Sequence, residues 1–478
     1  SRAVFEMLGG NVDLWVTNCP TPSVNCTVAI GPGNATLEMK GGRIRCGDLY
    51  VGRNQGNDPE KAKTHVQRLH MTGGEIICGR LYFGSSAANA TYKFQEAHAD
   101  LDGGVLTLEQ AFVNSTSGIN PDAHGYITAN GGTIRLAANN ANVLRDFDYV
   151  KCGPKGLTFD AGGKTPTLAH AIENKDGEQG LLRFTGSGTT LFDPSTYANT
   201  VTTTVLDGTT LQIKADGTML TDLVFTNSAF LNLTDAAISE GLTVKALHAT
   251  SGKVFLKPGA KIHVLTDDVD VSGLQVQINP APAADELSDV FTFDGDVTTN
   301  ASVRAFVRRL VSANSVSGKH ARFSAAYDEE TGKTVVSVVF KDEDAPYAEK
   351  TVWNGPAWTA DGWSAGVPTS TKVASFSNAS APTSVAVPSG AEAGALELTG
   401  GNDYSFSAAD EGAMLDFTGD LGGAWMNIAS GHHLFALPLT FTFPVPLTVA
   451  AGASVEFAAP LIDGGIQKTG KGRLVLSS

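Results

Sequence analysis

Three aspartates near the middle of the chain are the residues best suited to acid–base chemistry. They are Asp267, Asp268 and Asp270. Cleavage of a glycosidic bond needs two carboxyl groups about 5 to 9.5 Å apart, and Asp268 and Asp270 would lie on one face of a strand because side chains alternate along it. The alternative is a solvated turn, or at most a weak calcium site with oxygen ligands. We favour this alternative and predict no catalytic residues.

Two further kinds of ligand can be tested against the sequence. The segment from Gly465 to Lys471 has the spacing of a phosphate-binding loop. Gly472 follows it, however, where that motif needs a Ser or Thr to bind magnesium. No Cys or His cluster has the spacing of a zinc site. We therefore predict no cofactor, with Asp268 and Asp270 as the weak calcium candidate.

Three tryptophans recur every five residues, at Trp353, Trp358 and Trp363. Aromatic rings stack on sugars, so these residues are candidates for glycan binding. Aromatic side chains also bury a large apolar area, and burial at a corner or end of a repeat structure is the commoner role. Both interpretations stay open at this point.

The cysteines suggest two pairings. Cys19 and Cys26 flank a short proline-containing loop that a disulfide could close, as happens in oxidising compartments. Cys46 and Cys78 hold equivalent positions in two similar segments, so they should lie side by side. They are either buried free thiols or a disulfide between neighbouring strands, for which the geometry is tight.

A repeated glycine pair indicates which elements position these residues. The pairs are Gly9-Gly10, Gly41-Gly42, Gly73-Gly74, Gly103-Gly104, Gly131-Gly132 and Gly162-Gly163. A fixed period of about 20–50 residues is typical of repeat architectures. Glycine suits a sharp corner because it tolerates a positive φ and close approach of another backbone.

The residues after each pair alternate between apolar and polar, which is typical of a short strand. The apolar positions form two columns, Val12-Ile44-Ile76-Leu106-Ile134 and Leu14-Cys46-Cys78-Leu108-Leu136. Equivalent residues of successive repeats would then form ladders roughly 4.8 Å apart. The pattern predicts an all-β chain that folds as a right-handed parallel β-solenoid, or β-helix, with one coil of about 30 residues per repeat.

Changes in this pattern predict three segments. Residues 1–282 form the first solenoid, residues 283–347 a small α+β insertion, and residues 348–478 a second solenoid segment. The insertion contains a helix with Val303, Phe306, Val307, Leu310 and Val311 on one face, capped by Thr299 or Asn300. A hairpin-type turn at residues 328–333 follows it.

The final residues resemble a known family. The segment from Gly464 to Ser478, "GGIQKTGKGRLVLSS", is similar to the autotransporter-associated β-strand repeat, also called the passenger-associated transport repeat. The tryptophan-rich segment at residues 353–363 is similar to segments that open such passenger regions. The resemblance implies a secreted or surface-displayed bacterial β-solenoid, and such proteins serve as adhesins, scaffolds and occasionally enzyme carriers.

Charge and hydropathy exclude some partners. The net charge of −15 and the pI near 5.1 argue against nucleic acid or an anionic membrane as the main partner. No stretch of 18 apolar residues occurs, so we expect no transmembrane segment. The chain begins at Ser1 without an initiator Met or signal peptide, which we interpret as a processed product in an extracellular or cell-surface location.

The two ends of the chain lead to the functional hypothesis. Neither end shows an amphipathic capping helix, so terminal strands would expose unpaired backbone and apolar side chains. These edge residues are Val4, Phe5, Val12 and Leu14 at one end and Leu474, Val475 and Leu476 at the other. We predict a non-enzymatic structural protein that self-associates end to end into a fibre or layer. The alternatives are an adhesin that binds surface glycans and a polysaccharide-cleaving enzyme.

Overall fold

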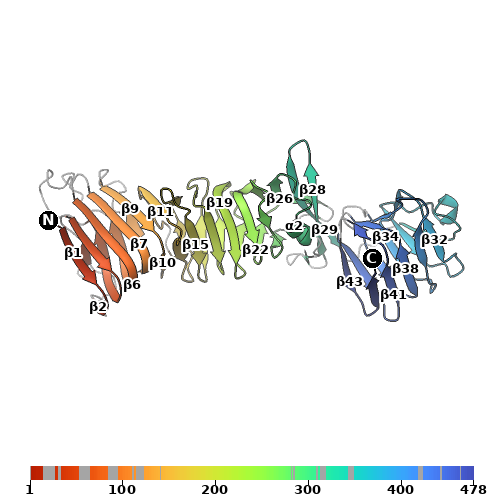
Figure 1. Cartoon of the computed structure of the whole chain (residues 1–478), viewed down its shortest axis with the longest axis horizontal. Helices are drawn as coiled ribbons and strands as arrows, with labels where there is room; N and C mark the ends of the chain where they lie inside the picture. Colours follow the sequence, from red (N-terminus) through yellow and green to blue (C-terminus); the bar gives the residue numbers. More distant parts are fainter. Residues whose placement is uncertain are drawn as a thin grey trace. The chain divides into compact units, whose positions relative to one another are not determined.

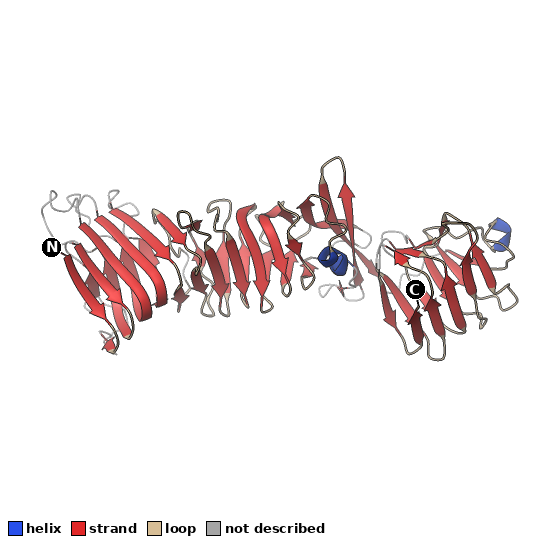
Figure 2. Ribbon diagram, viewed as in Figure 1, coloured by secondary structure: helices blue, strands red, loops and turns tan. Residues whose placement is uncertain are grey.

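The structure is a computed structural model of the whole chain. It describes residues 2–13, 27–30, 34–52, 65–83, 95–109, 112–114, 123–139, 142–280, 283, 286–307, 311–312, 319–342, 349–417, 424–441, 444–462 and 465–477. Strands dominate these residues, and the helical elements among them are α2 (Ala301–Val307) and the 3-10 turn η1 (Ala360–Gly362) (Figure 2). The predicted all-β class is therefore confirmed. Within the described ranges, no helix has the length and apolar character needed to cross a membrane.

The chain divides into two compact units, Ser1–Val276 and Gln277–Ser478. In the first unit, one row of strands carries the residues before the first five glycine pairs, continues through β11 and β14, and pairs in parallel from each repeat to the next (Figure 1). This row contains β1 (Arg2–Met7), β4 (Asn34–Met39), the first half of β6 (His65–Phe83), the first half of β7 (Gln95–Leu108), β9 (Ala123–Ala129), β11 (Tyr149–Cys152) and β14 (Glu173–Asn174).

The residues after the first five glycine pairs begin a second parallel row. Its members are β2 (Asn11–Asp13), β5 (Arg43–Val51), the second halves of β6 and β7, β10 (Gly132–Leu136), β12 (Leu157–Asp160), β15 (Leu181–Thr185), β17 (Thr203–Asp207), β19 (Gly217–Thr226), β21 (Gly241–Ala249), β23 (Lys261–Val264) and β24 (Val269–Asp270). The short strands β3 (Thr27–Ile30) and β8 (Phe112–Asn114) pair with the ends of β5 and β6.

The sixth pair, Gly162-Gly163, does not mark the corner between the two rows, since it follows β12 of the second row. The predicted coil of about 30 residues is also too long for the later repeats, because Gly132 pairs with Leu157 and Leu182 with Thr204.

A separate six-stranded sheet lies in the later part of this unit. Its strands are β13 (Thr167–Leu168), β16 (Thr189–Phe192), β18 (Thr210–Ile213), β20 (Phe230–Leu233), β22 (Lys253–Leu256) and β25 (Gln275–Ile278), in that order. The boundary between the two units falls inside β25.

The register confirms the columns expected from the sequence. Val12 pairs with Ile44, and the same column continues through Ile76, Leu106 and Ile134. The last four of these side chains are buried. Alternating apolar side chains therefore point into the core from every repeat, because residues i and i+2 of a strand share a face.

The second glycine of the pair adopts a positive φ in the first repeats, as its type predicts. Gly74 has φ +77°, and a Cβ there would lie 2.8 Å from the carbonyl oxygen of Gly42 in the preceding repeat. Glycine is thus required for two reasons, since L-residues avoid this conformation and the neighbouring backbone leaves no room.

The second unit begins with a small module of antiparallel strands and one helix. Strands β28 (Lys319–Asp328) and β29 (Lys333–Asp342) form an antiparallel hairpin. Strand β26 (Leu287–Asp294) pairs with β29, and β27 (Val311–Ser312) pairs with β28. Helix α2 is capped by Asn300, whose Oδ1 accepts a bond from the N–H of Ser302 at 2.8 Å. Phe306 of α2 packs its ring 4.8 Å from that of Phe323.

The helix is shorter than the sequence pattern predicts. It ends at Val307, and Val311 belongs to β27 instead of continuing the helical face. Val311 and Ser312 pair instead with Ala321 and His320 of β28, and this pairing overrides the local periodicity. Leu310 lies outside the described residues.

Residues 349–477 return to parallel pairing, now in three sheets that the chain visits in turn. The first contains β30 (Glu349–Val352), β31 (Lys372–Phe376), β34 (Ala395–Leu398), β37 (Met426–Ile428), β40 (Val445–Val449) and β43 (Ile466–Thr469). The second contains β32 (Ser384–Val387), β35 (Ser405–Ala408), β38 (His432–Ala436), β41 (Ser454–Phe457) and β44 (Arg473–Leu476). The third contains β33 (Ala391–Glu392), β36 (Leu415–Phe417), β39 (Leu439–Phe441) and β42 (Leu461–Ile462).

Candidate functional site: strand edges and side-chain ladders

Outer-face ion pairs join neighbouring repeats throughout the first unit. Arg80 donates from Nε and Nη2 to the two carboxylate oxygens of Asp48, both at 2.8 Å, from the equivalent position one repeat later. Further pairs of this kind are Lys40–Glu6, Arg68–Asp100, Arg135–Asp160, Arg183–Asp207, Lys214–Asp235 and Lys245–Asp222. Side chains as well as backbone bonds therefore connect each repeat to the next.

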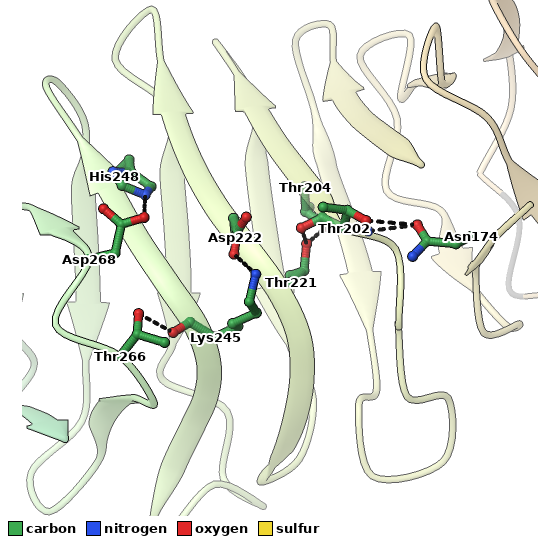
Figure 3. A network of polar contacts seen from close by, with 9 residues as sticks. All are labelled: Asn174, Thr202, Thr204, Thr221, Asp222, Lys245, His248, Thr266 and Asp268. Atoms are coloured by element: carbon green, nitrogen blue, oxygen red, sulfur yellow. Dashed lines mark hydrogen bonds and ion pairs between the residues drawn. The ribbon is translucent and has the colours of Figure 1, made fainter. Parts of the chain in front are cut away.

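Part of this network is shown in Figure 3. Lys245 donates to Asp222 Oδ1 at 2.9 Å, while its carbonyl accepts from Thr266 Oγ1 at 3.0 Å, so strands β19 and β21 and the segment after β23 are linked. Nearby, Thr221 Oγ1 donates to Thr204 Oγ1 at 3.0 Å in a buried position. Buried hydroxyls that satisfy each other in this way add polar contacts between β17 and β19 without the cost of an unpaired group.

The aspartates proposed for acid–base chemistry or calcium binding lie at the edge of the same network. Asp268 is 3.5 Å from Nε2 of His248, and Asp270 accepts bonds from the hydroxyl and the N–H of Ser272 at 2.6 and 3.0 Å. The Ser272 bonds hold the pKa of Asp270 below its ordinary value. These contacts favour the solvated-turn interpretation, and the part of the chain that the structure describes contains no group of three potential metal ligands.

The three tryptophans lie in the core. Trp353 is fully buried, and Trp358 and Trp363 are each 4% exposed. Their rings contact one another and Phe376, with centroid separations of 4.9 to 6.4 Å. Buried rings offer no open face to a sugar, so the core interpretation replaces glycan binding for these three residues.

The register places Cys46 beside Cys78, as the sequence alignment predicts. Both are buried free thiols, and so is Cys152. Burial raises the pKa of the Cys78 thiol well above its ordinary value and that of Cys152 to about 12. Such thiols are poor nucleophiles because the thiolate is the reactive form. Cys19 and Cys26, like Leu14, lie outside the described residues.

Strand β1 presents an apolar edge. Val4 is 52% and Phe5 59% exposed, although Phe5 stands in the column that continues inward through Leu37 and Leu69. A groove of about 260 Å³ lies beside it, lined by Val4, Phe5, Val28, Ala29, Ile30, Ala35, Thr36 and Leu37. Val12 of β2 is half-buried. The inner surface of this repeat is therefore accessible from one side.

Strand β44 has a comparable apolar edge. Leu476 is 63% exposed and pairs in register with the buried Phe457, while Leu474 and Val475 are half-buried. Lys468, Lys471 and Arg473 lie nearby in the segment from residue 465 to residue 477, which contains no acidic residue. Glu456 of β41 also lies beside this strand, in register with Val475 and bonded to Ser477. The edge is thus apolar, with charges of both signs near it.

Sequence reasoning missed two features of the outer face. His70 contacts Glu38 Oε2 through Nδ1 at 2.8 Å and Asp102 Oδ2 through Nε2 at 3.1 Å, so it connects three successive repeats. A row of rings, His98, Tyr126 and Tyr149, also runs along neighbouring strands. The sequence does contain a signal for this row of rings, because His98 and Tyr126 each lie five residues before a glycine pair.

Comparisons with known proteins add no relative to this geometry. No family model matches the chain, and no curated protein or solved structure is significantly similar to it.

Proposed function

We propose that this chain is a non-enzymatic structural protein, a right-handed parallel β-solenoid whose copies stack head to tail into a fibre or surface layer. The observation that carries the proposal is the repeat-to-repeat register. Strand β6, for example, pairs with both β4 and β5 of the preceding repeat and with β7 of the following one. A fold in which each repeat contacts its neighbours is suited to extension along one axis.

The side chains that join the repeats support a mechanical role. Buried columns continue through successive strands, and outer ion pairs such as Arg80–Asp48 join equivalent positions of two repeats. A second copy of the chain, placed next to the terminal repeat, would be able to continue the same kinds of contact.

The two apolar edges support the mode of stacking. A strand added in parallel beside β1 would cover Val4 and Phe5 and fill the groove of about 260 Å³. The β44 edge has Leu476 to bury, as the β1 edge has Val4 and Phe5, so the proposed contact joins two different apolar edges. Such a contact between unlike edges is heterologous, so it continues into a filament unless it closes into a ring.

We further propose an extracellular or cell-surface location on a bacterium, which the passenger-repeat resemblance of residues 464–478 supports. A fluorescent fusion followed by protease treatment of intact cells measures the location directly, since only a surface protein is removed.

Electron microscopy of the purified chain, together with light scattering over a range of concentrations, tests the assembly. We expect particles that lengthen with concentration. The double variant Val4→Lys, Phe5→Lys should keep the protein monomeric, because adding a strand would bury two unpaired charges. Leu220→Lys changes an equally exposed leucine on β19 and is the matched control.

Monodisperse monomers of the unmodified chain at high concentration would overturn the stacking proposal. Filaments that form equally well with both Lys variants would show that association uses another surface. Reducing-sugar release from polysaccharides, lost in Asp268→Asn, would instead establish the enzymatic alternative.

A further inference from the structure

The first glycine of a corner is needed where the preceding repeat comes close. A Cβ added at Gly73 would lie 2.6 Å from the carbonyl oxygen of Lys40 in the repeat before it, and one added at Gly41 would meet the carbonyl oxygen of Leu8 in the same way. Neither glycine has a positive φ. The neighbouring carbonyl, and not the local backbone conformation, is therefore what requires glycine at these two positions.

Gly9 has the same place in the first corner but no such neighbour. Its φ is not positive, and no atom in the described part of the chain lies within 4 Å of a Cβ added there. Alanine would therefore fit at this position in the isolated chain. The glycine has the same explanation as Gly41 and Gly73 if the backbone of another coil rests against it.

The edge beside Gly9 is also apolar. Val4, Phe5 and Leu8 are 52%, 59% and 70% exposed, and the groove of about 260 Å³ lies next to Val4 and Phe5. In the next repeat, Lys40 takes the position of Leu8. Exposed apolar side chains, a groove and a glycine without a local reason together describe one half of a repeat-to-repeat contact.

Hydrogen bonds at the corners give such a contact a direction. The first residue of the strand after a corner donates its N–H to the corner of the preceding repeat, as Arg43 does to the carbonyl oxygen of Gly10 at 2.9 Å. Residues 349–477 follow the same rule, since Arg473 donates to the carbonyl oxygen of Ala453 at 3.0 Å. The first repeat of the chain therefore offers corner N–H groups, and the last repeat offers corner carbonyl oxygens.

The last corner, residues 470–472 between β43 and β44, is guarded by a lysine. Lys468 Nζ donates to the carbonyl oxygen of Gly470 at 2.9 Å. Lys468 pairs in register with the buried Leu447, so it stands in a column that faces the core. A charged residue at an inward position of an edge strand discourages the addition of a further strand. A coil that docks here has to displace this lysine, which weakens the contact.

We propose that the last corner of one copy docks on the first corner of a second copy of this chain. A carbonyl oxygen of residues 470–472 rests on Gly9, and the N–H of Asn11 donates to the same corner. Phe5 and Leu8 are covered by the docked coil. This inference rests on the stacking proposed above and names the two surfaces that meet.

The fold tolerates the small differences in corner length that this contact involves. Within residues 349–477, the corner of residues 429–431 stacks on the corner of residues 450–453, because the strands on both sides of it pair in parallel. A corner of three residues therefore packs on one of four without loss of the flanking pairing.

Sedimentation velocity of the full chain over a range of concentrations tests the docking. Gly9→Ala should weaken association about tenfold or more, because its Cβ would meet the docked carbonyl, and should not lower the unfolding temperature. Gly332→Ala, also in open space but in the β28–β29 turn, is the matched control and should leave association unchanged. Lys468→Met should strengthen association, and adding Gly9→Ala should cancel that gain.

A photo-crosslinking amino acid in place of Leu8 identifies the occupant. In a mixture of isotopically labelled and unlabelled chains, we expect crosslinks to residues 465–477 of the other copy. Crosslinks to another segment, or association that Gly9→Ala leaves unchanged, would overturn this docking while stacking through another surface still stands. Monomers in every variant, Lys468→Met included, would overturn both the docking and the stacking.

Discussion

Two regions of the molecule use the same parallel pairing but different side chains to join their repeats. In residues 34–280, charged pairs such as Lys245–Asp222 and Arg183–Asp207 span neighbouring repeats on the outer face. In residues 349–477, rings stack inside the core, with centroids 4.3 Å apart between Phe406 and Phe435 and 5.2 Å apart between Phe435 and Phe457.

The difference shows that backbone register alone does not decide how repeats are held. Burial of apolar rings resists salt and contributes several kcal/mol at each position, whereas an exposed ion pair contributes about 0–1 kcal/mol and is screened by salt. The aromatic region should therefore depend on a few residues, and the charged region on many small contributions.

The largest effect is expected in the aromatic region. Phe435→Ala leaves a cavity between Phe406 and Phe457, and we expect it to lower the free energy of unfolding by about 3–5 kcal/mol. Urea denaturation followed by fluorescence of the buried tryptophans measures this. Tyr327→Ala, which truncates an exposed ring in the same unit, should change it by less than about 0.5 kcal/mol. Equal losses in the two variants would refute the role assigned to the ring stack.

One ion pair should behave unlike the others. The Asp48 side chain is fully buried and accepts two bonds from Arg80, so Arg80→Ala leaves a buried charge without its partner cation and should cost about 3 kcal/mol. Asp222→Ala breaks the more exposed Lys245–Asp222 pair and should cost about 0–1 kcal/mol. Unfolding measured at low and high salt separates the two, since only the exposed pair should be screened. A salt-sensitive effect of Arg80→Ala would contradict the comparison.

The glycine corners provide a test of how closely neighbouring repeats approach, since a Cβ at Gly74 would meet backbone of the preceding repeat and the Cε atom of Met39. Gly10 and Gly74 have nearly the same φ, +79° and +77°, but an added Cβ meets nothing within 4 Å at Gly10 and the Gly42 carbonyl oxygen at 2.8 Å at Gly74. We expect Gly74→Ala to cost about 1–2 kcal/mol more than Gly10→Ala. Thermal unfolding of the two variants gives the difference. Identical values would mean that φ alone, and not the preceding backbone, requires glycine.

The smallest effect concerns pH in the aromatic region. Burial lowers the pKa of His433 from its ordinary value of 6.5, and its Nδ1 accepts from the N–H of Tyr404 at 3.2 Å. The unfolded chain therefore binds a proton more readily than the folded one. The His433 contribution is fully present above about pH 6.5 and is lost as the pH falls from there through the lower folded pKa.

Denaturation at several pH values between about 4 and 8 gives the free energy of unfolding as a function of pH. Its slope should correspond to uptake of at most about one proton on unfolding. His433→Gln should flatten the slope below pH 6.5, whereas His432→Gln, on the exposed side of the same strand, should leave it unchanged. A slope that persists in His433→Gln would assign the titration to another group.

Much of the first unit was predictable because its signals are local. The first five glycine pairs marked the corners, and the alternation after them gave the columns that place Ile44 beside Ile76 and Cys46 beside Cys78. Residue type also predicted the turn at residues 328–333 and left the helix cap open between Thr299 and Asn300, of which Asn300 is the cap. The end of helix α2 was not, since it depends on pairing between β27 and β28.

For the candidate binding surfaces, too, residue type left open what only the tertiary structure decided. Residue types alone left Trp353, Trp358 and Trp363 open between core and glycan site, and only the packing against Phe376 showed them to be buried. The row of His98, Tyr126 and Tyr149 rings was missed because its members are separated by 23 to 28 residues. They become neighbours only through the register of β7, β9 and β11.

The sequence by itself determined the repeat, its glycine corners and the alternation of buried and exposed positions. These depend on backbone conformation and on the side-chain period of a strand, both of which residue type encodes locally. The tertiary structure alone decided which outer side chains meet, as when His70 contacts both Glu38 and Asp102. Those contacts join different repeats, and their partners are set by the offset between strands, which no single repeat contains.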